Sequence, residues 1–134
     1  YRIVNLASKE KIEVIAIPGP SAVTAALSVS GIPTDHFYFE GFLPPKKGRK
    51  TRFEILESLP ATVVIFESPQ RVIRTLRDIH NYWGYRIISV CRELTKMYEE
   101  TFLGTVTEAE VYFSKSKPKG EFVLLVSKKG YILE

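Results

Sequence analysis

The chain has 134 residues, of which 45% are hydrophobic and 25% charged, and its net charge is +4. This composition is typical of one globular domain and excludes a disordered tail, a collagen-like fibre and a coiled coil. A single cysteine, Cys91, excludes an intrachain disulfide. One cysteine and two histidines cannot assemble a Cys/His zinc site, and no apolar run is long enough to cross a bilayer, so we expect neither a metal nor a membrane partner.

The first third of the chain alternates between helical and strand patterns. Residues 2–10 have a helical apolar pattern, and residues 12–17 are typical of a mostly buried strand that ends at Pro18-Gly19-Pro20. A helix of small residues is predicted over 21–30. Residues 36–42 are rich in aromatic side chains and indicate a second strand.

The middle of the chain contains its most apolar strand and its longest helix. A loop and a helix over 49–58 precede the continuous apolar run 61–66, which indicates a central strand. Ser68 suits the N-cap of the next helix and Pro69 suits its first position. The apolar residues that follow recur at helical spacing as far as Trp83, so this helix is predicted to be amphipathic.

Strands over 86–92 and 100–106 are predicted next. A helix of about two turns then begins with the capping-box pattern Thr107-Glu108-Ala109-Glu110. Residues 121–127 form the last predicted strand. This alternation predicts an α/β fold in which helices flank one mixed sheet.

The turn from Pro18 to Ala22 is a candidate ligand site. It leads from a strand into the start of a helix, where backbone N–H groups are unpaired and carry partial positive charge. Gly19 and Ala22 leave little side-chain bulk, so a ligand could approach the backbone. The alternative is a turn that needs proline and glycine for its geometry alone. No G-x-G-x-x-G motif or P-loop supports nucleotide phosphate binding.

A basic segment follows the predicted strand 36–42. Its cations are Lys46, Lys47, Arg49, Lys50 and Arg52. The segment lies beside Pro44-Pro45, so we expect it to be exposed, and such a cluster can neutralise the phosphates of a nucleic acid. The alternative is a loop that is solvated and has no ligand.

Charged residues also follow two predicted strands. Glu67 ends the most apolar strand, and Arg92, Glu93 and Lys96 follow the strand that contains Cys91. Ligands of α/β sheets bind beyond the carboxyl ends of strands, which makes these residues candidates for a site. The alternative is that the last three pair with one another at the surface. Cys91 is expected to be a core residue. These patterns by themselves specify no reaction.

Six segments, taken in order, resemble the ribosomal RNA small subunit methyltransferase I family, the 2′-O-methylating branch of the tetrapyrrole (corrin/porphyrin) methylase superfamily. They are IPGPSA at 17–22, SGIPTD at 30–35, FEGFLP at 39–44, FESP with Arg71 at 66–71, RELTK with Glu99 at 92–99, and GEFVL at 120–124. Each segment is weak by itself, whereas the ordered set, which runs from residue 1 to about residue 127, is specific.

The resemblance implies that residues 1–134 are the single C-terminal domain of a two-domain methyltransferase. Residues 1–10 would be a helix after the domain junction, and the domain would contain a five-stranded mixed sheet flanked by helices. The N-terminal domain would be absent from this chain. S-adenosylmethionine would lie between the two domains, so this chain would supply one wall of the cofactor cleft and is expected to be inactive alone.

The resemblance further implies methyl transfer from S-adenosylmethionine to a cytidine ribose 2′-hydroxyl in small-subunit (16S) rRNA. It implies the 30S subunit and a second copy of the enzyme as partners, in the cytoplasm. The implied cofactor contacts are Ser21, Ala22, Phe66, Glu67, Glu121 and Phe122. The basic segment is the implied RNA contact, and Arg92, Glu93 and Lys96 are substrate-side candidates. The resemblance names no general base.

Two other functions remain open. One is a corrin or porphyrin methyltransferase of the same superfamily, against which the basic segment argues, because a tetrapyrrole needs no phosphate-binding arm. The other is a non-catalytic RNA-binding module, which no RNP-type aromatic motif supports.

Overall fold

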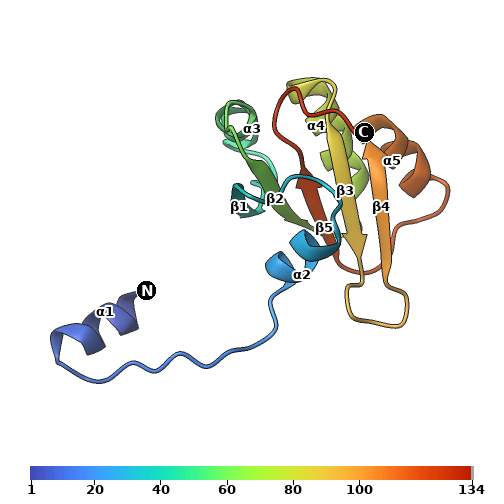
Figure 1. The fold of residues 1–134 in the computed structure, drawn as a ribbon. Helices are drawn as coiled ribbons and strands as arrows, with labels where there is room; N and C mark the ends of the chain where they lie inside the picture. Colours follow the sequence, from blue (N-terminus) through green and yellow to red (C-terminus); the bar gives the residue numbers. More distant parts are fainter. Residues whose placement is uncertain (134) are drawn as a thin grey trace.

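A five-stranded mixed sheet forms the centre of the computed structural model, which describes residues 1–133 (Figure 1). The strands are β1 (Phe37–Phe42), β2 (Thr62–Glu67), β3 (Ile87–Arg92), β4 (Glu100–Thr105) and β5 (Phe122–Val126). Their spatial order is β1-β2-β5-β3-β4. β1 pairs with β2 in parallel, whereas β5 is antiparallel to both β2 and β3, and β4 is antiparallel to β3. The predicted α/β fold with a five-stranded mixed sheet is confirmed.

Helices cover both faces of the sheet (Figure 1). α2 (Ala22–Val29) covers one face, and α3 (Arg49–Glu57), α4 (Val72–Trp83) and α5 (Val106–Ser114) cover the other. A further helix, α1 (Arg2–Lys9), lies away from the sheet (Figure 1). Successive strand residues point to opposite faces. Ile65 of β2 therefore packs in the core under α3, α4 and α5, while its neighbour Val64 packs in the smaller core under α2.

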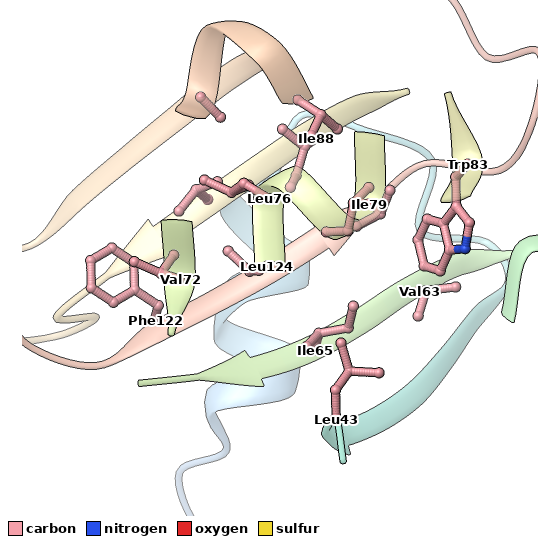
Figure 2. Close-up of a cluster of buried hydrophobic side chains, with 14 of the residues drawn as sticks. Leu43, Val63, Ile65, Val72, Leu76, Ile79, Trp83, Ile88, Phe122 and Leu124 are labelled. Atoms are coloured by element: carbon pink, nitrogen blue, oxygen red, sulfur yellow. The ribbon is translucent and has the colours of Figure 1, made fainter. Parts of the chain in front are cut away.

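The larger core lies between the sheet and α4 (Figure 2). The helical spacing of Val72, Leu76, Ile79 and Trp83 places these side chains on one buried face of α4, as the sequence predicts. The indole N–H of Trp83 donates to the carbonyl of Phe53 at 2.8 Å, so the polar end of this buried ring is satisfied. Cys91 is also buried, as predicted.

The strand predicted over 12–17 is wrong. In the structure this segment is extended without a strand partner and belongs to the connection between α1 and α2 (Figure 1). A strand needs a neighbour for its backbone N–H and C=O groups, and no described strand lies beside this one. Its apolar side chains, including Ile15 and Ile17, are exposed, and α1 buries none of its residues.

Two helix starts also differ from the sequence-based prediction. α4 begins at Val72 rather than at Pro69, because residues 68–71 form a turn in which the carbonyl of Ser68 accepts the N–H groups of Arg71 and Val72, each at 3.0 Å. The capping box of α5 is formed by Thr105 with Glu108, not at Thr107. β4 pairs with β3 only as far as residue 105, so the chain turns into the helix there.

Candidate functional site

Four of the predicted site residues meet at one edge of the sheet. Because β2 and β3 are both antiparallel to β5, their carboxyl ends lie beside the start of β5. Glu67 at the end of β2 and Arg92 at the end of β3 both pair with Phe122, and Glu121 precedes it. Residues far apart in the sequence therefore form one row at this edge.

The N-terminus of α2 carries free hydrogen-bonding groups. Ser21 is the N-cap, has an extended backbone and makes no side-chain capping bond. Its carbonyl accepts the N–H of Ala25 at 3.0 Å, which closes the first helical turn. The N–H groups of that turn have no partner within the helix, and the Ser21 side chain does not satisfy them.

Two hollows connect this helix start with the sheet edge. The strand-end pocket has a volume of about 380 Å³ and is lined by Ala22, Phe42, Phe66, Glu67, Ser68, Pro69, Glu121, Phe122 and Val123. The helix-start pocket has a volume of about 490 Å³ and is lined by residues of the 19–28 segment together with Leu94 and Thr95. Five of the six residues predicted to contact a cofactor line the first pocket. Ser21 lines the second, and Ala22 belongs to both.

Aromatic rings form the apolar wall of the strand-end pocket. Phe66 contacts Phe42 with ring centroids 5.9 Å apart and Phe39 with centroids 5.0 Å apart, both edge to face. Sequence reasoning did not select Phe42. The sequence signal for Phe42 is its place at the end of the strand predicted over 36–42. Neighbouring parallel strands end at the same sheet edge, and Phe42 pairs directly with Phe66.

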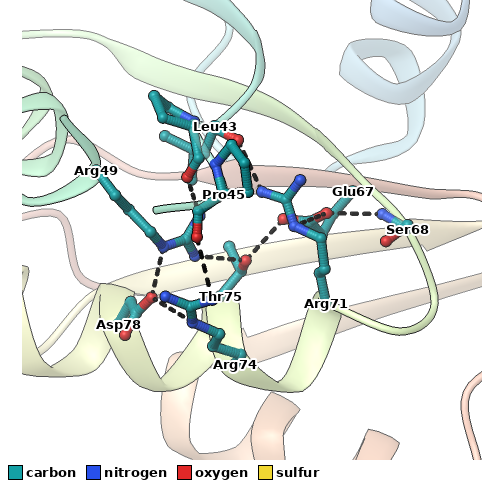
Figure 3. Close-up of polar contacts among 10 residues, drawn as sticks. Leu43, Pro45, Arg49, Glu67, Ser68, Arg71, Arg74, Thr75 and Asp78 are labelled. Atoms are coloured by element: carbon teal, nitrogen blue, oxygen red, sulfur yellow. Dashed lines mark hydrogen bonds and ion pairs between the residues drawn. The ribbon is translucent and has the colours of Figure 1, made fainter. Parts of the chain in front are cut away.

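The carboxylate of Glu67 is bound within the domain (Figure 3). One oxygen accepts the backbone N–H of Ser68 at 2.8 Å and lies 3.4 Å from Nε of Arg71. The other oxygen accepts the hydroxyl of Thr75 at 2.7 Å. Glu67 is only 2% exposed, and these contacts direct its carboxylate toward Arg71 and Thr75 at the start of α4. Its contact with a cofactor stays a prediction.

Glu93, Lys96 and Glu121 form a charged cluster at the mouth of the site. The Lys96 ammonium lies 3.0 Å from a carboxylate oxygen of Glu93 and 3.0 Å from one of Glu121. The pKa of Glu93 is lowered, first because its carboxylate accepts the backbone N–H of Glu121 and then because of Lys96. The pKa of Lys96 is raised, first by Glu121 and then by Glu93. Of the surface pairing that the sequence left open, the structure forms the Glu93–Lys96 pair, whereas Arg92 pairs with Glu100.

Arg92 lies beside this cluster. Its Nε is 2.9 Å from a carboxylate oxygen of Glu100 on the neighbouring strand. Arg92 also lines a hollow of about 360 Å³ with Glu93, Tyr98, Lys119 and Gly120. The substrate-side candidates are therefore adjacent in space, next to the strand-end pocket.

The basic segment divides into exposed lysines and bound arginines. Lys46, Lys47 and Lys50 are exposed. Arg49 is 5% exposed and its Nε pairs with Asp78 at 2.7 Å, so the expectation that the whole segment is exposed is wrong at this residue. Arg49 is the first residue of α3. Its long side chain extends to α4, where the guanidinium binds the carboxylate of Asp78.

Arg52 is bound as well. Its guanidinium pairs with the carboxylate of Glu40 and donates to the hydroxyl of Tyr38 at 2.7 Å. Both partners belong to the edge strand β1. The cations that the domain leaves open to a polyanion in this segment are therefore the lysines.

Residues 1–133 contain neither a metal-binding cluster nor a membrane-spanning helix. No group of three or more His, Cys, Asp or Glu side chains there is arranged to hold a metal ion. None of the helices in that range has the length and apolar character needed to cross a membrane.

Comparisons with known proteins identify the family of this chain. The model of the family Tetrapyrrole (Corrin/Porphyrin) Methylases matches residues 1–110. The chain is 45% identical over 129 residues to "Ribosomal RNA small subunit methyltransferase I" of Thermotoga maritima, covering 96% of this chain and 58% of that protein. It is also 45% identical over 135 residues to the protein of the same name from Halalkalibacterium halodurans, covering 100% of this chain and 47% of that protein.

The chain thus spans about half the length of the curated relatives it matches. Among solved structures, the methyltransferase CobJ superposes with a TM-score of 0.65 at 18% identity, covering 95% of this chain and 56% of that one. At that identity the likeness shows the fold alone. The family match extends over most of the sequence, and it includes the turn, the basic segment and the ends of β2 and β3. The chain belongs to the tetrapyrrole (corrin/porphyrin) methylases.

Proposed function

We propose that the protein containing this chain transfers a methyl group from S-adenosylmethionine to a cytidine ribose 2′-hydroxyl in small-subunit rRNA. In this proposal the 134 residues are the C-terminal domain of a two-domain enzyme and supply one wall of the cofactor cleft. The names of the relatives support rRNA as the acceptor. The observation that carries the proposal is the convergence of Ala22, Phe66, Glu67, Glu121 and Phe122 on one pocket.

The pocket residues fit such a cofactor. S-adenosylmethionine combines a flat adenine ring with a charged amino-acid end and a cationic sulfonium. Phe42, Phe66 and Phe122 offer the apolar surface that suits the ring. Ser21 and the free N–H groups at the start of α2 suit its polar groups. When bound, the cofactor supplies an activated methyl group.

The protein's task in this reaction is positioning. Displacement at the methyl carbon needs donor and acceptor held in line, and holding reactants in place removes much of the barrier. The small side chain of Ala22 permits close approach to the α2 backbone. Arg92 and the charged cluster lie at the same sheet edge, where we propose that they face the acceptor. No side chain is assigned as general base.

The exposed lysines support an RNA acceptor. Lys46, Lys47 and Lys50 carry no buried ion pair and are open to phosphates, which they would bind with release of counterions. The proposal includes the 30S subunit as the physiological acceptor. It also includes a homodimeric enzyme in the cytoplasm, as the resemblance to the rRNA methyltransferases implies.

A methyl-transfer assay with product analysis tests this function. The whole protein is incubated with labelled S-adenosylmethionine and 30S subunits, and the rRNA is digested to nucleosides for mass spectrometry. We expect 2′-O-methylcytidine. A parallel reaction offers a precorrin-type tetrapyrrole as acceptor. Label in the tetrapyrrole alone would refute the rRNA proposal, and label on an rRNA base would refute the ribose target.

A further inference from the structure

The segment that follows β1 is held by arginine side chains (Figure 3). Three consecutive backbone carbonyls each accept a hydrogen bond from a different arginine. The bonds are Arg71 Nη2 to Leu43 O at 2.7 Å, Arg49 Nη1 to Pro44 O at 3.1 Å, and Arg74 Nη1 to Pro45 O at 3.2 Å. Proline has no backbone N–H, so the carbonyls are the hydrogen-bonding groups that the two prolines offer.

A buried hydroxyl connects one of these arginines, Arg49, to the strand-end pocket. Thr75 Oγ1 accepts a hydrogen bond from Arg49 Nη2 at 2.9 Å and donates one to Glu67 Oε2 at 2.7 Å. Arg49 is further fixed by Asp78, and Glu67 lies beside Arg71. The contacts therefore run from a residue that lines the pocket to the loop backbone.

The centre of the network, formed by Arg49, Thr75 and Glu67, is buried. The side chain of Arg49 is 6% exposed, that of Glu67 is 0% exposed, and Thr75 is fully buried. Hydrogen bonds between charged partners are stronger in such surroundings, and an unmatched member is costly. Lys46 and Lys47 follow Pro45 directly and are exposed. Their placement depends on the backbone that the arginines hold.

We propose that Thr75 is a positioning residue that joins Glu67 to Arg49 and thereby fixes the Leu43–Pro45 segment at the Pro44 carbonyl, so that Lys46 and Lys47 present one conformation to an RNA backbone. The RNA consequence rests on the proposed function, whereas the pinning of the loop does not. A loop held in its binding conformation loses less conformational freedom on binding, and this raises affinity. The apparent dissociation constant scales inversely with the pinned fraction.

Tryptic cleavage of the whole native protein after Lys46 and Lys47 tests the pinning without RNA. Thr75→Val removes the hydroxyl at nearly constant volume and should raise the cleavage rate at least about tenfold, because two hydrogen bonds to charged groups are lost and cleavage tracks the open population. Thr75→Ser should restore the wild-type rate. Thr62→Val is the matched control, since it removes a buried hydroxyl that donates to Pro33 O at 2.6 Å, outside this network. Cleavage of Thr75→Val at the wild-type rate would overturn the proposal, and so would an equal acceleration of cleavage in Thr62→Val.

Steady-state kinetics with 30S subunits test the RNA consequence. A fourth variant, Arg49→Lys, keeps the charge but lacks the planar fork that reaches Asp78, Thr75 and Pro44 together. KM for the subunit should rise in the order of the tryptic rates, with kcat unchanged. Fast cleavage with an unchanged KM would overturn the RNA part of the proposal and leave the pinning intact. Loss of methylation in every variant, Thr62→Val included, would attribute the effect to stability and overturn the positioning role.

Discussion

Glu93 lies across Gly120, and its carboxylate accepts the backbone N–H of Glu121 at 2.8 Å. A Cβ built on Gly120 would come within 2.5 Å of Cγ of Glu93. Glu93 itself has a φ of 51°, which is uncommon for a residue other than glycine, and Gly120 has a φ of 88°. This contact ties the loop after β3 to the start of β5, beside the strand-end pocket.

Gly120→Ala should destabilise the protein more than Gly130→Ala. Both glycines have a positive φ, 88° and 80°, so alanine costs each position about 1–2 kcal/mol of backbone strain. Of these two glycines, Gly120 is the one with a neighbour within 4 Å of the added methyl group. In Gly120→Ala the Glu93 side chain must therefore move and lose its hydrogen bond. Urea unfolding of the two variants measures the difference. Equal losses would mean that the Glu93 contact contributes nothing.

The charged cluster should give the protein an acid-dependent component of stability. The pKa of Glu93 is lowered from its ordinary value of 4.5. Its contribution is therefore fully present above pH 4.5 and is lost as the pH falls through the lowered value. NMR titration should give Glu93 a pKa below 4.5 in the wild type. In Lys96→Met, which removes one cause of the shift, the pKa of Glu93 should lie nearer to 4.5. A Glu93 that titrates identically in both proteins would contradict the assigned cause.

Ser21→Asp should weaken cofactor binding without unfolding the protein. A carboxylate suits the N-terminus of a helix, so Tm should change little. The added bulk and charge should obstruct the helix-start pocket and lower S-adenosylmethionine affinity by about tenfold or more. Calorimetric titration of the whole protein measures this affinity. Thr107→Asp, in the first turn of α5, is the control for an added acid at a helix start, and equal affinities in the two variants would remove Ser21 from the site.

Replacing Lys46, Lys47 and Lys50 with Gln should reduce the salt dependence of binding to 30S subunits. Each phosphate contact contributes roughly 0.7 to 0.9 to the slope of log affinity against log salt, so three contacts predict a drop of about two units. Cofactor affinity should be unchanged. The control carries the same charge loss at Lys9, Lys11 and Lys128. A drop of equal size in the control would assign the effect to net charge, not to this loop.

The sequence predicted those parts of the fold that depend on local pattern. The spacing of Val72, Leu76 and Ile79 defined the buried face of α4, and the apolar run ending at Phe66 defined a central strand. It also grouped Glu67 with the other strand ends, because the ends of strands in one sheet meet at an edge. The pocket that the structure forms there follows from that rule.

Other features depend on long-range contacts that no local pattern encodes. Whether Arg49 reaches water or Asp78 is decided by how α3 packs beside α4, and the two residues are 29 positions apart. Residues 12–17 have the composition of a strand, but pairing needs a neighbour. Thr105 and Thr107 both begin a plausible capping box, and the end of the β3–β4 ladder selects the first.

The most direct test of the proposed division of the cofactor cleft is methyl transfer measured side by side for the whole protein and for these 134 residues. Both are given labelled S-adenosylmethionine and 30S subunits at equal concentration. We expect ribose methylation by the whole protein and none above background by the isolated chain, because the chain supplies only one wall of the cleft. Turnover by the isolated chain at a rate comparable to that of the whole protein would contradict this division and place the complete active site within residues 1–134.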